Sequence, residues 1–190
     1  MMQKRRAMSL IEMLIVMVIL FFVMGSLFWM VILGQTSWQS SVNQAGERQD
    51  TYTNLWRIAQ ELSDSNTGTI TDHTLGTPYG FSFLSAFDQN GKFVTDDQGL
   101  PVWQKYEIYY ISGDKLLNRD VYGSYTKPLT QPQLLGYMDG TGKLLAEGAK
   151  AFTLTINPNN TADINLTIDT INRNGKQDRQ VISVTSAIRN

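Results

Sequence analysis

The ionisable residues near the start of the chain are three cations and one carboxylate, placed before and inside a long apolar run. Lys4, Arg5 and Arg6 come first, and Glu12 is the one ionisable residue from Met8 to Leu33. A carboxylate at the centre of a membrane span raises the insertion free energy by about 2.5–3.5 kcal/mol, less near the end of the span, and such residues usually have a partner and a function. Glu12 therefore predicts a functional role that depends on a partner.

The apolar run is long enough to cross a bilayer. The 21 residues from Met13 to Leu33 contain no charge, Pro or Asn. At ~1.5 Å per residue a helix of this length measures ~31 Å, close to the ~30 Å hydrocarbon core of a bilayer. The basic block before the run places the N-terminus in the cytoplasm by the positive-inside rule. We therefore expect a single-pass protein whose C-terminal domain lies across the membrane.

The string Ala7-Met8-Ser9-Leu10-Ile11-Glu12 resembles the class III signal of type IV prepilins. That signal has a short basic leader, a small residue before the cut, a hydrophobic first mature residue and a Glu four residues later. The resemblance implies that a prepilin peptidase removes the leader, residues 1–7, by cutting between Ala7 and Met8, and that Met8 is then N-methylated. It also implies that Glu12 neutralises the positive N-terminus of a neighbouring subunit in a helical filament, because an amine and a carboxylate are tolerated in lipid as a pair. Ala7 stands where Gly is the norm in this family, which predicts slower processing.

Two simpler interpretations of the apolar run compete with this one. A secretory signal has an apolar region of ~7–15 residues followed by a cleavage site of small residues. Here the run is longer, and Gly34-Gln35-Thr36-Ser37 offers no such site. An ordinary single-span anchor stays open, but it gives no reason for Glu12.

Composition argues against several kinds of chemistry. The 190 residues include no Cys and a single His, His73, which we expect in a solvated loop. No nucleophile elbow, phosphate-binding glycine loop or His-Glu-x-x-His motif occurs, so we expect neither enzyme activity nor a cofactor or metal. Asn90-Gly91 and Asn174-Gly175 lack the ligand pattern of an EF-hand and predict hairpin turns, while calcium binding elsewhere stays open. Without the leader, 13 of the 16 Lys and Arg remain against 17 Asp and Glu, which argues against nucleic acid as a partner.

Helical periodicity continues beyond the apolar run and becomes amphipathic. We predict one helix from about Ser9 to Ser63. Residues 8–34 would form the transmembrane or filament-core part, and residues 35–64 would continue into a β-rich globular domain, residues 65–190. The predicted buried stripe consists of Val42, Ala45, Tyr52, Trp56 and Ala59, with Leu55 and Leu62 at its edge. Trp38 lies on the same stripe, where both burial and a place at the membrane interface stay open. The predicted polar face consists of Glu47, Asp50, Arg57, Glu61 and Asp64.

Period-two patterns dominate the rest of the chain and predict short antiparallel strands. The predicted strands are 81–87, 92–95, 102–112, 116–122, 152–156, 164–168 and 182–188. We expect a loop at 64–80 and an irregular excursion at 125–148. In the third strand Lys105, Glu107 and Tyr109 share one face and Tyr106 and Ile108 the other, so both faces should be partly covered.

The C-terminal half resembles minor pilins of the W type and J-type pseudopilins of type II secretion. The resemblance is carried by Trp103–Ile111 with Leu116, Leu117 and Arg119, by Leu145–Gly148 leading into Phe152, and by Ser183–Asn190. It implies an α+β, pilin-like fold, with a long N-terminal helix packed on antiparallel sheet.

By this resemblance the protein would be a minor subunit that primes assembly at a filament tip, after insertion in the bacterial inner membrane with a periplasmic C-terminal domain. Its partners would be prepilin peptidase, other major and minor pilin-like subunits and the inner-membrane assembly machinery. A membrane-anchored binding or adhesion module is the alternative. A pilus, a secretion pseudopilus and a DNA-uptake system all remain open as the machine.

Overall fold

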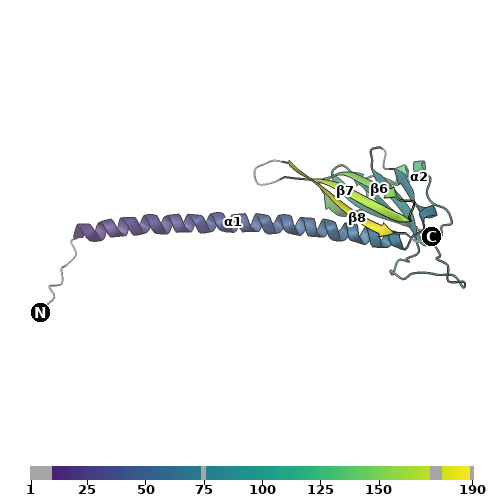
Figure 1. Ribbon diagram of the computed structural model, residues 1–190, viewed down its shortest axis with the longest axis horizontal. Helices are drawn as coiled ribbons and strands as arrows, with labels where there is room; N and C mark the ends of the chain where they lie inside the picture. The colour runs from purple at the N-terminus through teal and green to yellow at the C-terminus, as the bar shows by residue number, and fades with distance from the viewer. Residues whose placement is uncertain (1–9, 74–75, 172–176, 189–190) are drawn as a thin grey trace. The chain divides into compact units, whose positions relative to one another are not determined.

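The computed structural model describes residues 10–73, 76–171 and 177–188, and the fold is α+β. The helix α1 covers Leu10–Ser63, as the sequence predicts (Figure 1). The chain divides into two units, Met1–Glu47 and Arg48–Asn190. The second unit contains the last turns of α1 and all of the strands.

A five-stranded antiparallel sheet forms the first layer of the second unit, in the order β1-β2-β3-β4-β5. Its strands are β1 (Thr71–His73), β2 (Gly80–Ser85), β3 (Lys105–Ser112), β4 (Lys115–Tyr122) and β5 (Lys143–Glu147). The register sets Tyr109 of β3 opposite Phe81 of β2 and Asn118 of β4. The residues of β2 are all buried, as are seven of the eight residues of β3, so both faces of these strands are covered.

A three-stranded antiparallel sheet follows, in the order β6-β7-β8. Its strands are β6 (Ala149–Ile156), β7 (Thr161–Ile171) and β8 (Gln177–Ala187), which confirms the three strands predicted for this region. Gly148 carries the chain from one sheet to the next at φ 72°, and a Cβ there would lie 2.5 Å from the carbonyl oxygen of Asp169. Glycine is required because only it combines this backbone conformation with so close an approach.

Two apolar clusters cover opposite faces of β3. The larger joins α1 to both sheets through Leu55, Ile58, Ala59, Leu62, Phe81, Phe83, Tyr109, Ile111, Phe152, Leu154, Ile164 and Leu166, among others. The smaller lies on the other face and consists of Leu84, Tyr106, Ile108, Tyr110, Leu117, Leu129 and Leu134. The prediction that both faces of this strand are covered is confirmed.

The predicted buried stripe of the helix is wrong for its aromatic members. Trp56 and Tyr52 are 55% and 53% exposed, whereas Leu55, Ile58 and Leu62 are buried against the sheets. Trp38 and Val42 are also exposed, and the side chain of Ala45 lies outside the described part of the chain. Leu55, Ile58 and Leu62 follow the same helical spacing on a neighbouring face. Because Phe81, Tyr109 and Phe152 already fill this core with rings, the aliphatic face of the helix packs there.

Three further predictions for the polar segments need correction. The expected loop at 64–80 contains a 3₁₀ turn (η1, Thr67–Thr69) and β1, so His73 lies in a strand and is half-buried. The segment 92–95 forms isolated bridges rather than a strand. The expected irregular excursion holds a helix, α2 (Gln131–Tyr137), and β5. The start of α2 is fixed by Gln133, whose Oε1 accepts a hydrogen bond from the N–H of Thr130 at 2.9 Å, an N-terminal capping interaction.

Candidate assembly helix and the buried ionic cluster

The sequence-predicted site residues lie at the start of the chain. Ala7 and Met8 fall outside the described residues. Glu12 lies in the first turn of α1 and is exposed. It precedes a run of exposed apolar side chains that continues to Leu33.

The first part of α1 is built to lie in an apolar medium. Leu10–Gln39 is long and apolar enough to cross a membrane, and none of its most apolar stretch is buried within the chain. The hydroxyl of Ser26 donates to the carbonyl of Val23 at 2.8 Å, and that of Thr36 donates to the carbonyl of Leu33 at 3.0 Å. Such back-bonding satisfies hydroxyl groups where water is absent. An apolar surface of this size needs lipid or other protein chains around it.

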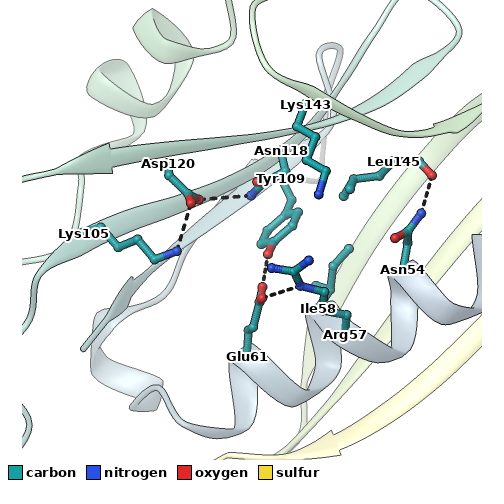
Figure 2. A pocket seen from close by; sticks show the side chains of 10 residues that line it. All are labelled: Asn54, Arg57, Ile58, Glu61, Lys105, Tyr109, Asn118, Asp120, Lys143 and Leu145. Atoms are coloured by element: carbon teal, nitrogen blue, oxygen red, sulfur yellow. Dashed lines mark hydrogen bonds and ion pairs between the residues drawn. The ribbon is translucent and has the colours of Figure 1, made fainter. Parts of the chain in front are cut away.

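The last turns of α1 are tied to both sheets by hydrogen bonds as well as by the apolar core. Asn54 Nδ2 donates to the carbonyl of Leu145 on β5 at 2.7 Å (Figure 2), and Ser186 Oγ on β8 donates to the carbonyl of Ala59 at 2.6 Å. The Tyr109 hydroxyl on β3 donates to the carboxylate of Glu61. Contacts to β3, β5 and β8 therefore hold one helix end.

Glu61 belongs to an ionic cluster where α1 meets β3, which is buried at Lys105 and Glu107 and open at Arg57. This corrects the predicted place of Glu61 on a solvated helix face. Lys105 Nζ lies 2.8 Å from Glu107 Oε1 and 2.9 Å from Asp120 Oδ2. Arg57 Nε lies 2.8 Å from Glu61 Oε1. We call Arg57, Glu61, Lys105, Glu107, Tyr109 and Asp120 the helix–sheet cluster.

The environment shifts the pKa values within the helix–sheet cluster in opposite directions. Burial and the charge of Glu61 raise the pKa of Glu107 to about 7, against the opposing effect of Lys105. Burial would also raise the pKa of Glu61, but hydrogen bonds from Glu107, Tyr109 and Arg57 outweigh it and lower that pKa. Burial tends to lower the pKa of Lys105, yet its two carboxylate partners raise it. Tyr109 has a pKa well above its ordinary value, because its ring is buried and faces both carboxylates.

A small cleft opens beside the helix–sheet cluster, lined by Arg57, Glu61, Tyr109 and Lys143 among others (Figure 2). Its volume of ≈ 130 Å³ is below the ~300 Å³ typical of the smallest ligand pockets. A second, wider groove of ≈ 540 Å³ lies beside Glu107 and is lined by Glu61, Lys105, Asp120 and Tyr122 among others. Glu107, at 1% exposure, is closed to a substrate. Among the described residues no group of three His, Cys, Asp or Glu side chains is placed to hold a metal ion. The hydrogen bond from Tyr109 to Glu61 holds the helix to the sheet, and the carboxyl groups of the cluster can bind protons.

Sequence reasoning placed Lys105, Glu107 and Tyr109 on one strand face but did not find the cluster. The sequence does contain an indication of the cluster, because the strand face that carries Lys105 and Glu107 also carries Ile111, an apolar side chain that is buried in the core. Two charges sharing a face with a buried Ile and Tyr predict a buried ion pair. The partner from α1, Glu61, is distant in sequence and carries no local signal.

One comparison with known proteins gives a match. Residues 2–28 match the family described as "Prokaryotic N-terminal methylation motif". The match covers residues 2–7 of the predicted leader, Glu12 and most of the apolar run. No curated protein and no solved structure matches the chain. Together with the apolar helix, the motif supports a type IV pilin-like protein that is anchored in a membrane.

Proposed function

We propose that this protein is a minor subunit of a type IV pilus or of a type II secretion pseudopilus, with a priming role at the filament tip. The observation that carries the proposal is that the methylation motif coincides with a helix whose apolar half is exposed and whose first turn contains Glu12. An ordinary membrane anchor needs the apolar helix but not the carboxylate. The minor role and the choice of these two machines rest on the resemblance of the C-terminal half to W-type and J-type proteins.

In this proposal the chain is inserted with its N-terminus in the cytoplasm and its globular domain in the periplasm. Prepilin peptidase cuts between Ala7 and Met8 and methylates Met8. The new terminal amine of one subunit then pairs with Glu12 of a neighbour. Removing one partner of such a pair leaves the other buried and uncompensated, at about 3–5 kcal/mol.

The exposed aromatic side chains of α1 give this proposal a second support. Tyr52 and Trp56 are four residues apart and both remain more than half exposed on the helix that carries Glu12. Side chains four apart share one face of a helix, and Trp and Tyr are enriched at the energetically dominant positions of interfaces. No enzymatic role is proposed, because the buried carboxylates of the helix–sheet cluster have structural partners.

The proposal is tested by replacing Glu12 in cells that carry the complete assembly machinery. Glu12→Ala should insert and be cleaved like the wild type, since the substitution removes a charge from the span. Its co-purification with other pilin-like subunits should fall at least ~10-fold, since ~1.4 kcal/mol already gives that factor. Glu147→Ala is the matched control, because Glu147 is an exposed glutamate on β5. Unchanged co-purification and filament output in Glu12→Ala would contradict the proposal and favour a membrane-anchored binding module.

A further inference from the structure

The helix–sheet cluster buries more charge than a structural contact between a helix and a sheet requires. Glu107 is 1% exposed and Lys105 is 8% exposed. Lys105 faces two carboxylates, those of Glu107 and Asp120. Its one positive charge therefore cannot neutralise both, and a buried carboxylate without full compensation tends to bind a proton.

Counting the hydrogen atoms gives the same result without reference to charge. The Tyr109 hydroxyl donates to Glu61 and also lies 3.2 Å from Glu107 Oε2. A phenol has one hydrogen to donate, and an ionised carboxylate only accepts. Two full hydrogen bonds of the hydroxyl, one with each carboxyl group, need a second hydrogen, which one of these carboxyl groups supplies when it is protonated. The pair Glu61 and Glu107 is therefore one proton short when both are ionised.

We propose that Glu61 and Glu107 share one proton in the folded protein, so that packing of α1 on β3 takes up a proton and is stabilised by mild acid. The proton lies between a helix residue and a strand residue, and it is lost from the contact when the two elements separate. The proposal concerns the globular unit and holds whether or not the chain assembles into a filament.

The charged and titratable groups around Glu107 favour protonation of the pair. Helix α1 contributes Arg57 and Glu61, and β3 contributes Lys105 and Tyr109. The other groups that share the groove with Glu107 are Asp64 after α1, Asp88 after β2, and Asp120 and Tyr122 on β4. Lys143 of β5 lines the cleft on the other side of Glu61 and Tyr109. Five carboxyl groups thus face three cations, and the excess of negative charge opposes ionisation of the most buried carboxyl group.

The direction of the pH effect follows from where the proton is bound. The pKa of Glu107 is raised from 4.5 to about 7 on folding, by burial first and then by the charge of Glu61. Between these values the folded protein holds a proton that the unfolded chain releases, so stability falls as pH rises through the window. The lowered pKa of Glu61 has the opposite effect on stability. Its stabilising contribution is lost as the pH falls below 4.5, the ordinary pKa of this glutamate. The unit should be most stable in mild acid.

The test measures urea unfolding of the full-length chain in detergent micelles between pH 5 and pH 8. For one proton the unfolding equilibrium constant should rise by up to ~10-fold per pH unit from pH 5 to pH 7 and flatten above it. Glu107→Gln should remove this rise. The control is Glu147→Gln, an exposed glutamate on β5, which should keep it. A wild type without the rise, or the same rise in Glu107→Gln, would overturn the proposal.

An infrared measurement covers the case in which Glu107→Gln does not fold. A protonated carboxyl group has a carbonyl band that an ionised one lacks, and ¹³C-labelled glutamate identifies it. Full-length chain with Glu12→Gln should show this band at pH 6 and lose it by pH 9, with no contribution from the apolar helix. Absence of the band at pH 6 would overturn the proposal.

Discussion

Replacing Leu62 should destabilise the globular unit far more than replacing Trp56, although Trp is the larger side chain. Leu62 is fully buried between α1 and the two sheets, whereas Trp56 is 55% exposed. Truncating a buried Leu to Ala removes its transfer free energy and leaves a cavity, together about 2–5 kcal/mol. An exposed substitution away from such contacts changes stability by about 1 kcal/mol or less.

These magnitudes translate into a large difference in melting temperature. At roughly 3–4 °C per kcal/mol for a domain of this size, Leu62→Ala should lower the Tm by about 6–20 °C. Trp56→Ala should lower it by about 4 °C or less on the same scale. Near-UV circular dichroism of the full-length chain in micelles reports on the packed rings of Phe81, Tyr109 and Phe152 and so follows the globular unit.

Thr53→Ala is the control for the loss of a side chain on this helix, because Thr53 is exposed and its hydroxyl donates to the carbonyl of Gln49 in the same helix. Its effect should stay within about 0.5 kcal/mol. If Trp56→Ala destabilised the unit as much as Leu62→Ala, the packed face of α1 would be the one that carries Tyr52 and Trp56. That result would refute the assignment of Leu55, Ile58 and Leu62 to the core.

Two further predictions concern the leader and the link between the sheets. Replacing Ala7 with a bulky residue should block cleavage and leave the full-length form on immunoblots, whereas Ala7→Gly should be cleaved at least as fast as the wild type. Equal processing of both variants would argue against a cut after residue 7. Gly148→Ala should destabilise the globular unit by about 1–3 kcal/mol, because its Cβ would lie 2.5 Å from the carbonyl oxygen of Asp169 and its φ is 72°. An unchanged midpoint of urea unfolding would show that the backbone between the two sheets shifts to make room for the Cβ.

The long helix and the C-terminal sheet were predictable because their signals are local. The apolar run without Pro fixes the course of α1, and the alternation in segments such as Phe152–Ile156 fixes β6. β1 has three residues, all of them polar, and carries no pattern of its own. α2 is only seven residues long and contains Gly136, which argues against a helix. Its start signals, Pro132 in the first turn and the capping pair Thr130 and Gln133, are too short a pattern to define a helix alone.

The packed face of α1 could not be read from its sequence, because two apolar stripes run side by side along its last turns. Tyr52 and Trp56 follow helical spacing as well as Leu55, Ile58 and Leu62 do. The choice between them depends on the shape of the sheet surface, which forms from strands far along the chain. The same holds for the helix–sheet cluster, where Glu61 meets a strand that begins at Lys105.

The most direct test of the proposed function is the mass of the mature N-terminus. The protein is extracted from membranes of cells with an active prepilin peptidase, and its N-terminal peptide is measured by mass spectrometry. We predict a chain that begins at Met8 with one methyl group on its amine. A chain that still begins at Met1, or that is cut at another position, would contradict the proposal.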